Sequence, residues 1–316
     1  MTITDLAPPS PAPETVAPEK KLDRLNTVSA TRVREPEDEF DWASLGTGQI
    51  VPDELLSIDP EKYGLTASQR AQLAREETAA LLETGVRFES MLMAGFCIQL
   101  AEQRRIDISR GTYMLHEVGE ESRHSRAFLR LYEQIDPQAD NPLVQGVPGL
   151  GRRLVQRLLV HRPALLLVFV LAGEEIPDLI QKRAADHPDT DPLIVQLNRY
   201  HRQEEARHLA YAKLRLPELR DETSRFDRFR IRHSVPVGIS QLFMGLIHPG
   251  VYAAVGLPGW RTWLRASRSR RRLQLRYEAC RPILHAVMDA GFVRPGRVPR
   301  AWRRLCGVDK DGQPNR

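Results

Sequence analysis

The sequence repeats a short pattern in which a glutamate precedes a histidine by three residues. Glu121 and His124 form the first copy, and Glu205 and His208 form the second, 84 residues later. On a helix, residues three apart lie on the same face, with about 5 to 6 Å between their Cβ atoms. Each pair is therefore spaced to chelate a metal ion. The doubled pattern restricts the chain to folds in which helices meet around a shared site, as in a four-helix bundle.

An isolated acid in an apolar stretch precedes the first copy. Glu89 lies 32 residues before Glu121, and its neighbours at helical spacing include Leu92, Met93 and Phe96. Burying an unpaired carboxylate costs on the order of several kcal/mol unless the group takes up a proton, pairs with a cation or binds a metal. Glu89 is therefore a candidate ligand.

The matching acid of the second half is one of two neighbours, Glu174 or Glu175, which close the apolar run 164–173. Glu174 precedes Glu205 by 31 residues and Glu175 precedes it by 30, so the spacing of 32 in the first half favours Glu174. The apolar residues that follow are phased slightly toward Glu175. Glu174 is the preferred ligand, and Glu175 remains the alternative.

A third histidine distinguishes the two halves. His201 lies four residues before Glu205, so His201, Glu205 and His208 share one helical face, whereas the corresponding position in the first half is Glu117. Mixed carboxylate and imidazole ligands suit iron or manganese, and the lack of thiolates argues against a structural zinc site. We predict two iron ions, with manganese as the less favoured alternative. The predicted ligands are Glu89, Glu121, His124, Glu174, His201, Glu205 and His208.

A simpler interpretation exists for each copy alone. A single Glu-x-x-His pattern is common on solvated helices, and Arg123 or Arg207 could form a surface ion pair beside it. Two copies with matched upstream acids and an inward third histidine favour the di-metal interpretation.

Helix-capping residues and prolines predict where the helices begin and end. Thr66, with Gln69 as a capping box, begins a helix that runs to about residue 104, and Ser109 begins one that runs to about residue 133. After a crossover at 137–151, a helix is predicted from about Pro163 to residue 185, and Asp191 begins another that ends near residue 214. Further helices are expected at about 222–234, 237–247 and 259–288, with a turn at 248–252. The pattern indicates an all-α fold with additional C-terminal helices.

Composition divides the chain into two parts. Residues 1–45 are rich in proline and poor in apolar side chains, which predicts a disordered tail. Residues 46–316 are expected to form a single domain. The N-terminal stretch lacks the apolar core of a signal peptide, and the three cysteines, Cys97, Cys280 and Cys306, are scattered, which favours a cytoplasmic protein without a membrane partner.

The net charge of +5 is concentrated in one basic segment with few interleaved aromatic residues. Such a segment binds nucleic acid or anionic lipid, or is the solvated face of a helix. The scarcity of aromatic residues favours the solvated face, so nucleic acid is a disfavoured partner. The arginines are Arg261, Arg265, Arg268, Arg270, Arg271, Arg272 and Arg276.

Across about residues 66–290 the chain resembles the p-aminobenzoate N-oxygenase family of di-iron oxygenases, which belongs to the ferritin-like superfamily. The resemblance rests on the two Glu-x-x-His copies, their upstream acids and the additional His201. Carried over, it implies the same seven ligands. The acid before each copy is commonly Asp in that family, whereas this chain has Glu120 and Glu204, which would be hydrogen-bond partners of ligand histidines.

The resemblance implies activation of O2 at two irons and oxygen transfer to a small-molecule substrate, an aryl amine. The chain has no flavin, nicotinamide or iron-sulfur motif, so a ferredoxin or reductase is the implied electron donor. A homodimer is left open. Rival functions are a di-iron hydroxylase, desaturase or oxidase, an iron-storage or structural metal protein, and a nucleic-acid-binding helical protein.

Overall fold

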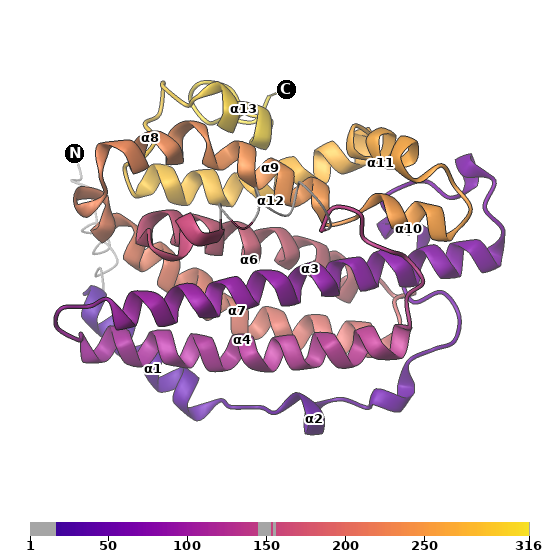
Figure 1. Ribbon diagram of the computed structural model, residues 1–316, viewed down its shortest axis with the longest axis horizontal. Coiled ribbons are helices and arrows are strands. Elements are labelled where there is room, and N and C mark those ends of the chain that lie inside the picture. The colour runs from indigo at the N-terminus through magenta and orange to yellow at the C-terminus, as the bar shows by residue number, and fades with distance from the viewer. Residues whose placement is uncertain (1–16, 145–152, 154–155, 316) are drawn as a thin grey trace, which may run out of the picture.

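Four long helices form the body of the protein. The computed structural model describes residues 17–144, 153 and 156–315. In it, α3 (Ala67–Ala101) packs along α4 (Ile108–Ile135), and α6 (Pro163–Asp186) packs along α7 (Pro192–Glu222) (Figure 1). Within the described residues there is no strand, only an isolated bridge between Val308 and Pro314. The prediction of an all-α bundle is confirmed.

Three of the four bundle helices, α3, α4 and α7, begin at side chains that cap them. The Thr66 hydroxyl accepts a hydrogen bond from the Gln69 amide at 3.3 Å while the Gln69 side chain accepts from the Thr66 amide at 3.0 Å, which is the predicted capping box. Asp191 accepts from the Leu193 amide at 2.9 Å, and Pro192 follows at the first helical position. These caps fix where α3 and α7 start.

The start of α4 and the end of α7 differ from the predictions. Asp107, not Ser109, caps α4, because its carboxylate accepts from the Arg110 amide at 3.1 Å. Helix α7 continues to Glu222, past the predicted end at residue 214 and through Pro217. Leu216 and Leu219 beside this proline are buried, so packing keeps the last turns helical although the proline lacks a backbone donor.

Residues 17–45 are ordered, where the sequence predicts a disordered tail. They form α1 (Pro18–Thr31), α2 (Pro36–Glu39) and a 3₁₀ turn, η1 (Trp42–Ser44). Apolar side chains are few in this segment, but Leu22 and Trp42 are buried, and α1 packs across α4 (Figure 1). Two further 3₁₀ turns, η2 (Asp53–Leu55) and η3 (Glu61–Tyr63), lead into the bundle. Residues 1–16 lie outside the described part of the chain, as do residues 145–151 of the predicted crossover.

The C-terminal third covers the α6 side of the bundle. It comprises α8 (Arg225–His233), α9 (Val235–Gly245), α10 (Pro249–Ala254), α11 (Gly259–Ser267), α12 (Arg270–Asp289) and α13 (Arg300–Cys306). Helix α12 packs on α6, opposite the side on which α1 lies (Figure 1).

Two details of this region correct the predictions. The expected turn at 248–252 is the short helix α10, which His248 precedes and Pro249 begins. The expected helix at 259–288 is two helices, α11 and α12, because the Ser269 side chain accepts from the Arg272 amide and starts a new helix there.

The basic segment is only partly a solvated face. Arg271 donates from Nη1 to three backbone carbonyls, those of Asp53, Leu56 and Ile58, at 3.0 to 3.1 Å. Arg272 is buried and donates to the Phe243 carbonyl at 3.1 Å. These two arginines therefore tie α12 to the rest of the fold.

One stretch, Val235–Ala254, is long and apolar enough by length and composition to cross a membrane. In the fold it is two helices, α9 and α10, separated at His248, and 44% of its most apolar window is buried. Buried core helices meet the same test, so this stretch is weak evidence of a membrane span.

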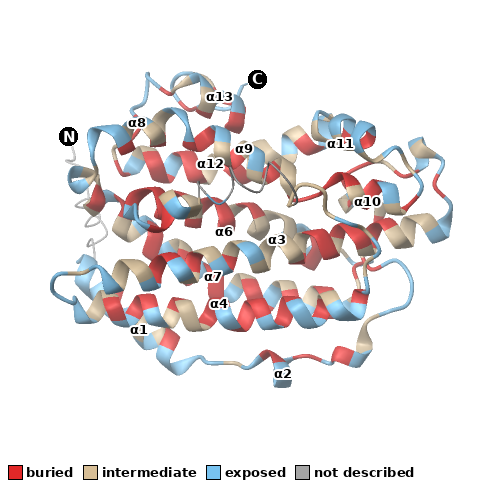
Figure 2. Cartoon of the chain, in the orientation of Figure 1, coloured by how far each residue is buried: buried red, intermediate tan, exposed pale blue. Residues whose placement is uncertain are grey.

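Buried residues run along the facing sides of α3, α4, α6 and α7, whereas the helices around them have both buried and exposed residues (Figure 2). The interior includes an unusual number of charged groups. Ten glutamate and histidine side chains of the four bundle helices lie in its middle, each at most 4% exposed. They are Glu89, Glu117, Glu120, Glu121, His124, Glu174, His201, Glu204, Glu205 and His208.

Candidate metal centre

The seven predicted ligands converge from all four bundle helices. Helix α3 supplies Glu89, α6 supplies Glu174, and α4 and α7 supply the two Glu-x-x-His pairs together with His201. Their nitrogen and oxygen atoms form several overlapping groups in which all donor atoms lie within 4.8 Å of one another. Residues far apart in the sequence thus form one buried cluster.

The two Glu-x-x-His glutamates lie between the two histidines. Glu205 places Oε1 3.0 Å from Nδ1 of His124 and Oε2 2.8 Å from Nδ1 of His208. Glu121 places Oε2 3.5 Å from Nδ1 of His124 and Oε1 3.3 Å from Nδ1 of His208. Each carboxylate therefore presents one oxygen to each imidazole, so each could contribute to two cations bound between the histidines.

The far nitrogen of each histidine is held by the other copy of the pattern. Nε2 of His124 lies 3.0 Å from Glu204, and Nε2 of His208 lies 2.8 Å from Glu120. A carboxylate accepts hydrogen bonds, so Nε2 carries the proton in each pair and Nδ1 faces the centre. The family resemblance implies that Glu120 and Glu204 partner ligand histidines, and the structure shows that each partners the histidine of the opposite copy.

Arginines hold these two acids in place. Arg207 donates to Glu120 at 2.7 Å, and Arg123 lies 3.7 Å from Glu204. Burial opposes ionisation of Glu120, but its hydrogen bonds from His208 and Arg207 lower its pKa to about 2. On the simpler interpretation of the sequence, these arginines would form ion pairs at the surface. In the structure both are buried, and they pair with the acids that contact the ligand histidines.

Several ligand atoms lack any hydrogen-bond partner. Both oxygens of Glu121, Oε1 of Glu205 and Nδ1 of His124 are buried and unpaired. Buried polar atoms are nearly always satisfied, and these four all point at the space between the two imidazoles. The residues therefore fit a pair of bound cations, which would satisfy these atoms and supply redox chemistry that side chains cannot.

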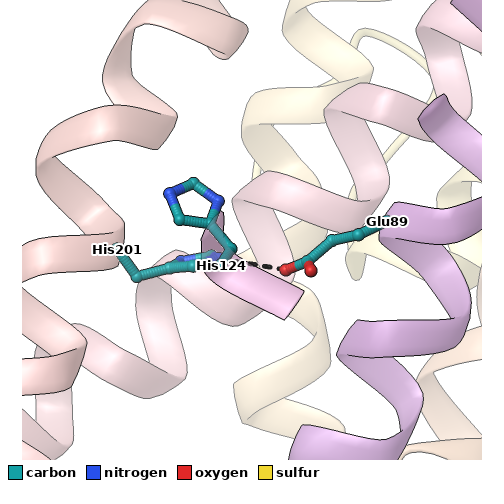
Figure 3. Close-up of side chains that lie close together, drawn as sticks. All are labelled: Glu89, His124 and His201. Atoms are coloured by element: carbon teal, nitrogen blue, oxygen red, sulfur yellow. Dashed lines mark ion pairs between the residues drawn. The ribbon is translucent and has the colours of Figure 1, made fainter. Parts of the chain in front are cut away.

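His201 and Glu89 complete the side of the centre nearest His124. Nε2 of His201 lies 3.5 Å from Glu89 and 3.3 Å from Glu205, and its Nδ1 lies 3.0 Å from Gln181. Ser125 donates to the second oxygen of Glu89 at 2.5 Å. Figure 3 shows the Glu89 carboxylate directed at the imidazoles, with the His201 ion pair dashed. Gln181 and Ser125 are supporting residues that the sequence did not single out.

Glu174 and Glu175 point to different surroundings. Glu174 is buried and belongs to a possible ligand group with His201 and Glu205. Glu175 instead pairs with Lys213 at 2.6 Å. The structure therefore brings Glu174, and not its neighbour, to the centre.

A further buried acid joins the cluster. Glu117 is fully buried, neither of its oxygens has a hydrogen-bond partner, and it groups with Glu121 and His208. Burial raises its pKa to about 8. It was not among the predicted ligands, although its spacing before Glu121 equals that of His201 before Glu205 and could have identified it.

The same low-polarity interior alters other ionisable groups. Burial raises the pKa of Glu89, and burial together with Glu205 and Glu121 raises that of Glu174. For His124 and His208, burial opposes the charged form, but the surrounding glutamates raise the pKa of both well above the ordinary value. Metal ions bind deprotonated ligands, so cation binding at this centre would release protons.

A cavity of about 170 Å³ adjoins the centre. Glu89, Glu174 and His201 line it, together with Phe88, Arg272 and a largely apolar set of side chains from α3, α6, α7 and α12. A small molecule in this cavity would lie beside the candidate ligands.

A family model described as P-aminobenzoate N-oxygenase AurF matches residues 16–291. The chain belongs to this family. The assignment predicted from the metal-ligand pattern is thereby confirmed, and the helical bundle is consistent with the ferritin-like fold of its members. The family is one of di-iron-dependent oxygenases, which use O2 and a substrate.

Named relatives add no chemistry to this assignment. Uncharacterized proteins of Mycobacterium bovis and of two strains of Mycobacterium tuberculosis are each 26% identical over 322 residues, which covers 93% of this chain and 89% of theirs. No solved structure gives a significant match. The carboxylate and imidazole cluster is therefore the main guide to what this chain does.

Proposed function

We propose that this protein is a di-iron oxygenase that uses O2 to oxidise the nitrogen of a small aryl amine. The observation that carries the proposal is the pair of carboxylates, Glu121 and Glu205, that each face both Nδ1 atoms of His124 and His208. Mixed carboxylate and imidazole ligands suit iron, and iron is redox-active. The predicted set Glu89, Glu121, His124, Glu174, His201, Glu205 and His208 would hold the two ions.

The size of the cavity supports a compact substrate. A cavity of about 150 Å³ can hold one benzene molecule, and this one measures about 170 Å³. Phe88 offers a ring surface in a lining that is mostly apolar. An aromatic ring with one or two substituents suits this space better than a long acyl chain does.

The cavity also contains a cation that would suit an acidic ring substituent. The Arg272 guanidinium stacks on Phe243 at 4.5 Å and uses Nη2 for the carbonyl of that residue. A guanidinium has five N–H donors, so others remain for a substrate carboxylate.

The protein's own residues would orient the substrate and exclude water. The apolar lining would hold the ring, and Glu120 and Glu204 would keep the Nε2 protons of the ligand histidines in place. Electrons would come from a separate ferredoxin or reductase, since the sequence carries no flavin or iron-sulfur motif.

The test is oxygen transfer from labelled O2. Iron-loaded, chemically reduced protein should consume O2 faster than free iron does and should add labelled oxygen to the nitrogen of p-aminobenzoate or a related aryl amine. His208→Ala is the control, because it removes a central ligand. If labelled oxygen appears in thioethers, fatty acids or aldehydes but not in aryl amines, the oxygenase function stands and the N-oxygenase assignment is wrong. If O2 consumption does not exceed the free-iron background, the oxygenase function is wrong.

A further inference from the structure

Glu117 is a fully buried carboxyl group for which the seven-ligand set has no use. It lies on α4, both of its oxygens are buried, and neither has a hydrogen-bond partner. An unpaired buried carboxylate is costly, so a partner missing from the protein itself is expected. One oxygen of Glu117 lies within 4.8 Å of ligand atoms of both Glu121 and His208.

The internal repeat indicates what this partner is. His201 lies four residues before Glu205 on α7 and faces His124 of α4, with which it forms a candidate ligand group together with Glu89. Glu117 lies four residues before Glu121 on α4 and faces His208 of α7. The arrangement is therefore reciprocal. The α7 residue His201 lies beside the α4 histidine, and the α4 residue Glu117 lies beside the α7 histidine.

We propose that Glu117 is an eighth ligand, bound to the metal ion that His208 holds. The inference rests on the proposed di-metal function and goes beyond the ligands that the family resemblance implies. On the His124 side His201 would supply a second imidazole, whereas on the His208 side Glu117 would supply a carboxylate from the equivalent position of the repeat. The two metal positions would therefore differ chemically, because only the one beside His124 would have two imidazole ligands.

Cobalt(II) binding to the full-length apoprotein tests the proposal without any need for activity. The variants are Glu117→Ala, which removes the ligand, and Glu117→Gln, which keeps its size. Glu133→Gln is the matched control, since Glu133 is an exposed acid on the same helix. Anaerobic titration gives the number and affinity of bound ions, the visible spectrum of cobalt reports its ligands, and circular dichroism checks the fold.

Wild type and Glu133→Gln should bind two cobalt ions. Glu117→Ala and Glu117→Gln should keep one site unchanged and lose at least about 10-fold in affinity at the other, because loss even of a ligand's hydrogen-bond partner has effects of that size. Glu117→His, which copies His201, should restore the second site with an altered spectrum. Two sites of wild-type affinity and spectrum in both Glu117→Ala and Glu117→Gln would overturn the proposal. Failure of the wild type itself to bind two ions would overturn the di-metal function instead, and this inference with it.

Discussion

Glu174 and Glu175 are neighbours on one helix, and their side chains differ in direction by about 100°. Glu174 is buried in the cluster, and Glu175 pairs with Lys213. Glu174→Ala should therefore lose bound iron, whereas Glu175→Ala should retain it. Iron content per folded chain is the measurement. Greater loss in Glu175→Ala would show that the ligand assignment of α6 is wrong.

Arg272 is the residue that should select for an acidic substrate. Arg272→Gln should raise the KM for p-aminobenzoate by about 10- to 100-fold, because a charge-assisted hydrogen bond contributes about 1.5 to 3 kcal/mol. The KM for aniline, which has no carboxylate, should change little. Iron content of the variant controls for damage to the fold. Equal changes for both amines would mean that Arg272 has only a structural role.

Glu77 provides a test of how burial affects a side chain away from the metal centre. Burial raises its pKa above the ordinary value of 4.5, although Ser57 donates to it from both amide and hydroxyl. The folded state thus keeps a proton that the unfolded state loses above about pH 4.5, so the contribution of Glu77 to stability falls as pH rises from there. The stability of Glu77→Gln relative to wild type should increase between pH 4.5 and neutrality. Denaturant unfolding measures this difference, with exposed Glu61→Gln as the control whose difference should stay constant.

The spacing of the glutamates and histidines predicted which of them lie on the same side of a helix, because residues three or four apart on a helix share a face. Tertiary pairings could not be predicted in this way. Glu120 is hydrogen-bonded to His208, and Glu204 to His124. These pairings depend on how α4 packs against α7, which the spacing of residues along the sequence does not specify. Glu117 has the place on α4 that His201 has on α7, but the sequence pattern indicated it only as the position where the first half lacks a third histidine.

At the scale of elements, helix starts were more predictable than helix ends and tails. A capping side chain acts locally, as Thr66 and Asp191 do. The order of α1 comes instead from contacts with distant residues, such as the hydrogen bond from Arg207 to Ser29 and that from Asn26 to the Ser109 carbonyl. The prediction of disorder from proline-rich composition was therefore wrong for residues 17–45, because contacts with distant residues stabilise that segment.

The contact between α3 and α6 depends on one glycine. A Cβ at Gly173 would overlap the ring of Phe88, next to Glu174 and the cavity. Gly173→Ala should destabilise the protein by about 1 to 3 kcal/mol through overpacking and should displace Phe88. Gly245→Ala is the control, because a Cβ there meets nothing within 4 Å. Thermal unfolding of the two variants measures the effect, and equal stability would contradict this account of the packing.

At the scale of the whole molecule, the four bundle helices and the layers around them enclose a cluster of acids and histidines that a metal-free core would not favour. Four of the predicted ligands are carboxylates, namely Glu89, Glu121, Glu174 and Glu205, and Glu117 adds a fifth, so bound cations would offset the repulsion among them. The C-terminal helices contribute Arg272 of α12 to the lining of the cavity.

Metal content tests this central claim most directly. Protein produced with iron in the medium and purified without chelators should carry close to two irons per chain by elemental analysis, because the cluster has too many ligands for one ion. His124→Ala and His208→Ala should each reduce that number. A reproducible content of one zinc and no iron in the wild type would contradict the account.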